Sequence, residues 1–520
     1  MTLPLFLLLA CSGDPPVEET PVTWTLSSTD PLPASAPASV LLVNLVGDSV
    51  RVTGAVDGDF HVDVDPPDDL EAAFRYRVLT AEGEELTRRS VPGPAQVQAY
   101  LGFYSDLAGL DLLEMFPQLG DFPLHVPRLE GGALVALDMR GDDGAWTELT
   151  RVPLSVANDP TPAGTEAVVG HDTLWQGGPP ESSLDIVILG DGYRQSELAR
   201  FRNDARALAD RLVTAEPLAT YAHRLNVHRV DAVSAESGVS YDCADGDCGF
   251  RDTAFGSLFA VELVNRLLGA DYRTSAVFQI EQWEVARAAS VVPWDLAVII
   301  ANTSHDGGFA MHYATAPNAD DEWVETGVHE FGHLLGWLGD EYNKDLCFVS
   351  PALGLPPNIA DDLDHLPWAH HVDPDTPLPT PGEDAYDDVI GAFASAFNCD
   401  DLYRPARTCR MRSSVYGFCD VCAEQLVRRI FRHVDVIEDI AWSSDGGDLT
   451  LTVTGEAPLT ATWTLNGAPL GQAGAGEPLT LRAGALSEGE LVVEVEHRSP
   501  WVLAHGGELA ETRRFNLSAD

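Results

Sequence analysis

The residues best suited to chemistry in this sequence are His329, Glu330 and His333, which form the pattern His-Glu-x-x-His. Two imidazoles four residues apart project from the same face of a helix, so both can bind one metal ion. Zn²⁺ accepts imidazole ligands, and a glutamate beside the first histidine is placed to act on a water molecule at the metal. We predict His329 and His333 as zinc ligands and Glu330 as the catalytic residue. The alternative is a buried helix whose histidines only satisfy hydrogen bonds.

The sequence around this pattern favours an amphipathic helix that would hold it in place. Five apolar residues recur at steps of four and three and predict one buried stripe, turned away from the histidines: Val324, Val328, Phe331, Leu335 and Leu338. Acidic residues at 320–322 precede the stripe, and negative charge is favoured at the start of a helix. Gly336 and Gly339 offer places for the helix to stop and for the chain to turn back.

A catalytic zinc site needs a third protein ligand, which must come from outside this helix. The continuation HEFGHLLGWLGDEY resembles the metzincin arrangement, in which HExxHxxG is followed by a third ligand. Gly339 stands at the usual third-ligand position, and Asp340 and Glu341 follow directly after it. We take Asp340 as the third ligand of a single catalytic Zn²⁺, with Glu341 in reserve.

Length and composition describe a large acidic protein. At 520 residues the chain is too long for one hydrophobic core, and about two to four domains are expected. The formal net charge of −50 argues against nucleic acid or an anionic membrane as a partner. Clustered carboxylates could bind Ca²⁺, but no EF-hand-like spacing supports such a site.

The first residues, MTLPLFLLLACSGDPP, look like a bacterial lipoprotein signal that is cleaved before Cys11 and leaves that cysteine lipidated. No Lys or Arg precedes the apolar run, which departs from the usual pattern, and a soluble protein with an apolar start is the alternative. No other segment reaches the roughly 18 consecutive apolar residues of a membrane span. We expect an exported, extracytoplasmic protein that is secreted or anchored at the outer membrane or cell surface. Its membrane contact would come only through the lipid.

Eight cysteines suit an exported chain, in which disulfides are stable. Cys243 and Cys248 bracket a short loop rich in Asp and Gly, and we expect them to pair. If Cys11 carries lipid, an odd number remains, which leaves one thiol free or paired elsewhere. A further group could form a structural four-thiolate zinc site: Cys399, Cys409, Cys419 and Cys422.

The alternation of strand-like and helix-like segments predicts a multidomain α+β protein. Short β-prone runs separated by turn residues indicate antiparallel β domains at both ends. Strand-like runs at 184–189, 226–230 and 294–301 alternate with helical patterns and indicate an α/β region between them. The predicted parts are a lipoprotein signal peptide (1–11), a flexible linker (12–38), an N-terminal β domain (39–160), a zinc metallopeptidase domain (166–433) and a C-terminal immunoglobulin-like β-sandwich (434–520).

Three stretches in this order resemble a bacterial zinc metallopeptidase family named for an immunoglobulin A-cleaving enzyme: DIVILGDGY, NVHRVDAVSAESGVS and HEFGHLLGWLGDEY. The similarity covers roughly 184–432. It implies a zinc endopeptidase with a metzincin-like catalytic core, acting on a protein or peptide. Residues 305–313 lie where such peptidases run an exposed edge strand, to which a peptide substrate can add. His305 and His312 in this stretch are further conceivable ligands.

Metzincins place a methionine in a turn beneath the metal, and Met411 in the stretch CRMRSSVYGFC looks like that residue. An ordinary core methionine is the alternative. Some metzincins have a tyrosine two residues after this methionine that stabilises the transition state. Ser413 occupies that position here, and Tyr416 is the candidate substitute.

These features predict peptide-bond hydrolysis in which Glu330 activates a zinc-bound water. Two other classes stay open. One is a lipid-anchored surface adhesin or receptor whose peptidase core is inactive, against which the intact His329, Glu330 and His333 argue. The other is a zinc exopeptidase or amidase, which only the choice of substrate separates from an endopeptidase.

Overall fold

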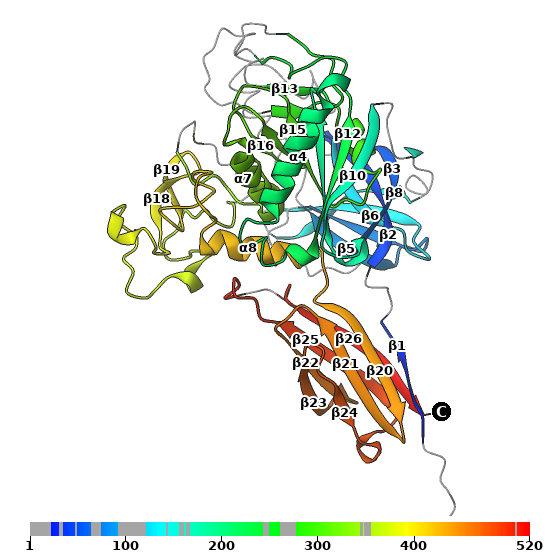
Figure 1. The fold of residues 1–520 in the computed structure, drawn as a ribbon. Coiled ribbons are helices and arrows are strands. Elements are labelled where there is room, and N and C mark those ends of the chain that lie inside the picture. The colour runs from blue at the N-terminus through cyan, green and yellow to red at the C-terminus, as the bar shows by residue number, and fades with distance from the viewer. Residues whose placement is uncertain are drawn as a thin grey trace, which may run out of the picture. The chain divides into compact units, whose positions relative to one another are not determined.

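The computed structural model describes most of the chain, which forms two compact units (Figure 1). The larger unit contains residues 32–436 and 497–511, and the smaller unit contains residues 1–31, 437–496 and 512–520. The described residues are 22–30, 35–46, 49–63, 74–91, 121–141, 144–154, 161–162, 167–242, 249–259, 277–343, 347, 355–504 and 507–519. They form a mixed, strand-rich structure with several sheets, which agrees broadly with the predicted multidomain α+β class. Cys11, Cys243 and Cys248 lie outside the described residues, so the lipid attachment and the disulfide stay predictions.

A six-stranded sheet forms the centre of the larger unit, with the strand order β10-β12-β11-β15-β17-β16. Its strands are β10 (Val168–Gln176), β11 (Leu184–Asp191), β12 (Leu225–Ala232), β15 (Leu296–Ala301), β16 (Phe309–Ala310) and β17 (Ala314–Pro317). The four inner strands run parallel, and β10 and β16 pair antiparallel at the two edges. β11 is buried along its whole length, because a parallel strand is covered on both faces. β11, β12 and β15 confirm the three predicted strands.

Helices cover both faces of this sheet. Those that matter for the site are α4 (Leu198–Leu212), α6 (Gln282–Ala289), α7 (Trp323–Gly336) and α8 (Asp420–Ile430). Ala286 of α6 shares a core with Val187 and Leu189, which alternate along β11 and so lie on one face of the sheet. α4 and α7 pack against each other and against the sheet on its other face, and α7 also packs against α8.

The N-terminal strands form two four-stranded sheets, β6-β2-β3-β9 and β5-β4-β7-β8. Their bounds are β2 (Ser35–Val46), β3 (Ser49–Asp63), β4 (Phe74–Leu79), β5 (Glu85–Val91), β6 (Asp121–Pro127), β7 (Leu134–Arg140), β8 (Trp146–Pro153) and β9 (Thr161–Pro162). Leu41 and Val43 of β2 pack among the N-terminal strands, whereas Val40 and Leu42 pack into the core that contains β11 and α6. The N-terminal strands therefore share a core with the central sheet and belong to the same compact unit.

The smaller unit contains a five-stranded sheet, β1-β26-β25-β22-β23, and a three-stranded sheet, β20-β21-β24. Their bounds are β1 (Trp24–Ser28), β20 (Ile437–Asp445), β21 (Asp448–Gly455), β22 (Leu459–Leu465), β23 (Ala468–Gly474), β24 (Leu479–Leu481), β25 (Gly489–His497) and β26 (Ala510–Ala519). Buried and exposed residues alternate along β21, β22 and β25, so each sheet has one covered face. An immunoglobulin-like topology for this unit stays a prediction.

Strand β1 differs from the sequence-based expectation, because it lies within residues 12–38, which were predicted to be a flexible linker. It pairs antiparallel with β26, at the opposite end of the chain. Trp24 is only 6% exposed, and its indole N–H donates to the carbonyl of Gly447 at 2.8 Å. A buried aromatic side chain with a satisfied N–H anchors this segment in the smaller unit.

The segment after α7 carries little regular structure but has a packed core of its own. It contains β18 (Phe393–Ala396), β19 (Cys399–Arg404), and the short 3₁₀ helices η5 (Ala369–His371) and η6 (Asp384–Tyr386). Trp368 is buried together with Leu366, Ala392 and Val421 of α8. A disulfide joins Cys347 to Cys399, so Cys399 is not available for the predicted four-thiolate site.

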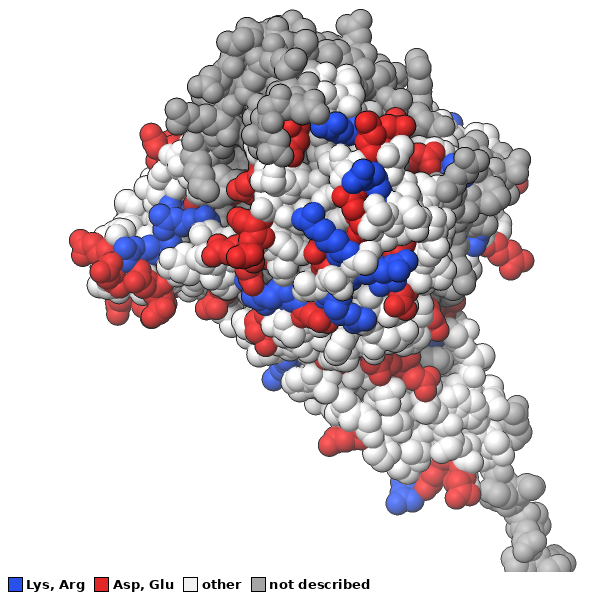
Figure 2. Space-filling view, turned by 45° about the horizontal axis from the view of Figure 1, so that its top comes forward, with Lys and Arg blue, Asp and Glu red and all other residues white. Residues whose placement is uncertain are grey.

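Acidic and basic side chains are interspersed on the face of the molecule shown in Figure 2, although the chain has a net charge of −50. Arginines of α4 pair with carboxylates, as in Arg202–Asp231 at 2.9 Å and Arg211–Glu325 at 2.7 Å. Among the described residues, no helix is both long and apolar enough to cross a membrane.

Candidate metal centre

Helix α7 carries the His-Glu-x-x-His pattern, and its apolar stripe is buried largely as predicted. Val328, Phe331, Leu335 and Leu338 are at most 3% exposed, while Val324 is half-buried. These contacts fix the helix against α4 and the sheet, so the histidine face is held in one orientation.

The end of α7 differs from the expectation that a glycine would make the turn. Trp337 adopts the left-handed conformation, with φ of 54°, and the guanidinium of Arg429 lies 3.4 Å from the centre of its ring. Gly336 is instead needed for close packing, because a Cβ there would lie 2.9 Å from Leu338 and 3.0 Å from Leu426 of α8. The cation–π contact helps to offset the cost of the left-handed backbone.

The three predicted ligands converge on one point. His329 Nε2 and His333 Nε2 lie 3.1 Å apart, and Asp340 Oδ1 lies 3.1 Å from the first and 3.2 Å from the second. Their side chains are 9%, 17% and 23% exposed, so the cluster is open to solvent on one side. The helix supplies two ligand atoms, and the turn after it supplies the third.

The hydrogen bonds of the two rings determine which nitrogens face the cluster. His329 Nδ1 donates to the carbonyl of Arg410 at 2.8 Å, and His333 Nδ1 donates to the carbonyl of Leu338 at 2.5 Å. Because a carbonyl can only accept, each neutral ring carries its proton on Nδ1 and presents a lone pair on Nε2. Two nitrogen lone pairs and a carboxylate oxygen thus face one another, an arrangement that a bound cation would stabilise.

The charges of these groups also act on one another's pKa values. Burial lowers the pKa of His333, but the carboxylates of Asp340 and Glu330 and the carbonyl of Leu338 together outweigh burial and raise this pKa to about 9. The two histidines in turn hold the pKa of Asp340 far below its usual value, although burial opposes them. The donor set is therefore strongly attractive to positive charge.

Glu330 is buried beside this cluster. A Cβ placed on Gly308 would lie only 2.3 Å from Glu330 Oε1, so the carboxylate lies against the backbone just before β16. Among the described residues, no side chain or backbone group donates a hydrogen bond to it. Burial raises the pKa of Glu330 to about 7, against the opposing effect of His329 and His333. A carboxyl group with this pKa can exchange a proton near neutral pH.

The turn that carries Asp340 is held by the segment after α7, a role that the sequence did not reveal. The Asn358 side chain accepts from Gly339 N–H at 2.7 Å and donates to Gly339 O at 2.9 Å. The backbone N–H of Phe397 donates to Asp340 O at 3.0 Å. The only sequence signal was an asparagine in a long segment, which is too common to single out Asn358.

A second support comes from the turn at 409–418. Arg410 is buried and its guanidinium donates to Glu325 Oε2 at 2.7 Å, while its own carbonyl orients His329. Met411 is fully buried, and its sulfur would lie 2.9 Å from a Cβ at Gly332, between the two histidines of the helix. Met411 therefore packs against α7 beside Gly332, and its assignment as the methionine beneath a bound metal stays a prediction.

Two other predicted residues lie apart from the cluster. The Glu341 carboxylate is directed to three cysteines, with Cys422 Sγ donating to its Oε1 at 3.2 Å, and is not one of the converging ligands. Tyr416 is 44% exposed and, within the described residues, makes no hydrogen bond or ring contact with the cluster. The ring of Tyr342 is stacked with His329 at 6.4 Å between centroids. A role for Tyr416 in transition-state stabilisation stays a prediction.

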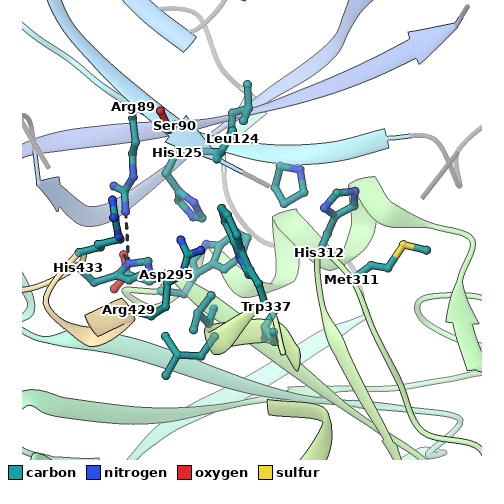
Figure 3. A pocket seen from close by; sticks show the side chains of 17 residues that line it. Arg89, Ser90, Leu124, His125, Asp295, Met311, His312, Trp337, Arg429 and His433 are labelled. Carbon is teal, nitrogen blue, oxygen red and sulfur yellow. Dashed lines mark hydrogen bonds and ion pairs between the residues drawn. The ribbon is translucent and has the colours of Figure 1, made fainter. Parts of the chain in front are cut away.

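The two further histidines considered as ligands also lie elsewhere. His305 contacts the ring of Phe259 at 4.6 Å, and its Nδ1 is 3.6 Å from Asp242. His312 lines a cavity of about 140 Å³ between the N-terminal strands and the central sheet, together with His125 and Trp337 (Figure 3). Burial lowers the pKa of His312 to about 3. None of the three converging ligands lines this cavity.

Comparison with known proteins relates the part of the chain that carries the cluster to a family model. A search of curated proteins gives no match. Residues 173–388 match the family model described as IgA Peptidase M64, and this range includes α7, Glu330 and Asp340. The match supports a peptidase that hydrolyses peptide bonds. This match agrees with the resemblance drawn from the order of the motifs, and it makes residues 173–388 of the chain similar to the IgA Peptidase M64 family.

Proposed function

We propose that this protein is an exported, zinc-dependent endopeptidase whose metal ligands are His329, His333 and Asp340. The observation that carries the proposal is the convergence of two imidazole lone pairs and one carboxylate oxygen beside the buried Glu330. Three protein ligands that leave an open side suit a catalytic zinc site.

The residues present fit zinc. Both rings are held in the tautomer that exposes Nε2, and carbonyls of Arg410 and Leu338 set their orientation. Zinc bound here would act as a Lewis acid, polarising the scissile carbonyl and making water more acidic. Asp340 would compensate part of the charge, since its carboxylate already lies against both imidazoles.

Glu330 would act as the general base and then as the general acid. In its ionised form it accepts a proton from the attacking water, and it later passes that proton to the leaving amine. Its burial and its lack of a hydrogen-bond donor among the described residues keep the carboxylate available for this exchange. Its position against Gly308 places it beside the edge of the sheet.

The edge strand β16 offers a place for the substrate backbone. In the described sheet it pairs with β17 on one side only. An extended peptide can add to such an edge by backbone hydrogen bonds, with specificity supplied by its side chains. A substrate that runs along an open edge can extend in both directions, which favours cleavage of internal bonds.

The test compares Glu330→Gln with Glu322→Gln, a matched change at an exposed position just before α7. The assay is cleavage of an internally quenched peptide with both ends blocked, alongside zinc content by elemental analysis. In Glu330→Gln we expect cleavage to fall roughly 10²- to 10⁴-fold, the usual contribution of general acid–base catalysis, with zinc retained. Glu322→Gln should behave as the wild type. Wild-type cleavage in Glu330→Gln would refute the assigned base.

The wild-type protein also tests the reaction class. Cleavage of the doubly blocked peptide that a chelator abolishes and zinc restores supports an endopeptidase. Cleavage only of peptides with a free terminus would instead indicate an exopeptidase, and bound zinc without any cleavage would favour a binding protein. Export with a lipid on Cys11 belongs to the same proposal, and loss of membrane attachment in Cys11→Ser tests it.

A further inference from the structure

A second group of metal-binding side chains lies next to the histidine cluster but separate from it. Glu341, Cys409, Cys419 and Cys422 bring one carboxylate oxygen and three sulfurs within 4.8 Å of one another. Glu341, Cys409 and Cys422 are completely buried. The proposed catalytic reaction uses none of the four.

The hydrogen bonds available to Glu341 do not satisfy it. Its Oε1 accepts from Asn358 Nδ2 at 3.0 Å and from Cys422 Sγ at 3.2 Å, but its Oε2 is buried and has no partner. A buried carboxylate oxygen without a partner is costly, which makes it a reason to look for a ligand.

The nearest positive side chain does not resolve this cost. Arg404 is close enough to favour negative charge on Glu341 and Cys409. Its guanidinium, however, donates to the carbonyls of Ala394 and Ser395 at 2.6 and 2.5 Å, and among the described residues it forms no ion pair with Glu341. Within the described part of the chain, Arg404 therefore leaves Glu341 Oε2 without a hydrogen-bond partner.

The distances fit a tetrahedral metal better than a disulfide. Cys409 Sγ and Cys422 Sγ are 3.6 Å apart, whereas a disulfide requires about 2.05 Å. Zinc binds thiolates at about 2.3 Å, which places two sulfurs of a tetrahedron about 3.8 Å apart. The Cys409–Cys422 separation is therefore close to the edge length of a zinc–thiolate tetrahedron.

The sequence spacing agrees with this geometry. Cys419 and Cys422 form a Cys-x-x-Cys pair at the start of α8, where Cys419 is the residue before the first helical turn. The start of a helix favours anionic groups, so it supports thiolates. Cys409 lies on the preceding turn, and its sulfur accepts from Cys419 N–H at 3.4 Å. Because Cys399 is paired with Cys347, Glu341 takes the fourth position.

We propose that Glu341, Cys409, Cys419 and Cys422 bind a second zinc ion in a closed, structural site. Four protein ligands would complete a tetrahedron and leave no position for water. The unpartnered oxygen of Glu341 and the three close sulfurs would all gain a partner from one ion. This inference does not depend on the proposed peptidase activity.

Such a site would join the two turns that support the catalytic cluster to the start of α8. Glu341 directly follows the ligand Asp340, and its N–H donates to Met411 O at 2.8 Å. Cys409 directly precedes Arg410, whose carbonyl orients His329. α8, which begins at this site, packs against α7. A zinc ion here would hold the turn at 340–341 and the turn at 409–411 in register.

The experiment measures metal content and thiol protection in the full chain. Elemental analysis should find two zinc ions per wild-type chain, one in Cys422→Ser and one in His333→Ala, the matched change at the other site. In cobalt-loaded protein, a sulfur-to-cobalt charge-transfer band should persist in His333→Ala and weaken strongly in Cys422→Ser. The histidine site contains no sulfur ligand, so the two sites are read separately.

A measurement on the wild type covers the case in which Cys422→Ser fails to fold. Mass spectrometry after alkylation should show Cys409, Cys419 and Cys422 protected until a chelator removes the metal. A disulfide between any two of these three cysteines, or their alkylation in the metal-loaded protein, would overturn the proposal. One zinc per chain, lost in His333→Ala, would overturn it too, while leaving the peptidase proposal intact.

Discussion

Two adjacent carboxylates, Asp340 and Glu341, lie in very different surroundings. Asp340 meets two imidazoles in a cluster that is partly open, and its side chain is 23% exposed. Glu341 meets three cysteines and is completely buried. The two side chains thus contribute to two separate clusters, although they are adjacent in the chain. The difference in burial fits the two roles proposed above, a catalytic role for the first carboxylate and a structural role for the second.

The groups around each carboxylate support this contrast. The open cluster has Glu330 beside it, with a pKa that burial raises to about 7, and the edge strand β16 nearby. The closed cluster has no such base among the described residues, and its fourth ligand comes from the protein. A catalytic metal site keeps one coordination position free for water or substrate, whereas a structural metal site has all its positions filled by protein ligands.

The largest expected effect comes from replacing each of the two carboxylates, Asp340 and Glu341, with the corresponding amide. Asp340→Asn should lower kcat/KM by more than the roughly 10- to 100-fold typical of residues that only orient ligands, because it removes a ligand charge. Glu341→Gln should keep most of the activity and lower the melting temperature. Both variants are compared by peptide cleavage and thermal unfolding. A Glu341→Gln variant as inactive as Asp340→Asn at a temperature where it is folded would contradict the division of roles.

The sequence was sufficient for the local part of the open site. The stripe from Val328 to Leu338 predicted α7, and the step from His329 to His333 predicted that both imidazoles lie on one face, because both depend only on helical spacing. The proximity of Asp340 followed from a turn of a few residues. These contacts are close in sequence, so few alternative arrangements compete with them.

The closed site could not be predicted in the same way, because its members are distant in the chain. Cys399 was grouped with the other cysteines by its position in the sequence, yet the fold pairs it with Cys347. Glu341 is 81 residues from Cys422, to which it is hydrogen-bonded. For the same reason, strand β1 was not predicted from the sequence: its partner β26 lies at the other end of the chain. Periodicity reports which face of an element is buried but not what covers it.

The pH dependence of cleavage should follow the open site alone. A general base must be ionised, and burial raises the pKa of Glu330 to about 7. The positive charge of bound zinc acts in the opposite direction, so the acid limb of kcat/KM should have its midpoint at or below pH 7. Below it, activity should fall about tenfold per pH unit. Glu341→Gln should show the same limb, and a limb that moves in this variant would place Glu341 in the catalytic site.

The smallest of the expected effects concerns Asn358, the residue shared by both sites. Its side chain holds both backbone groups of Gly339 and also donates to Glu341, and all three hydrogen bonds are buried. Asn358→Ala leaves the Gly339 N–H without this partner, which should lower the free energy of unfolding by about 1–3 kcal/mol. Asn343→Ala is the matched control, because its side-chain hydrogen bonds are exposed and its loss should cost no more than about 0.5 kcal/mol. Denaturant unfolding measures both variants.

Asn358 takes no part in the proposed reaction and only holds the turn that carries both carboxylates. Its loss should therefore weaken zinc retention at both sites more than it slows the zinc-loaded enzyme. A loss of activity at full zinc occupancy would show instead that Asn358 sets the geometry of the open site alone.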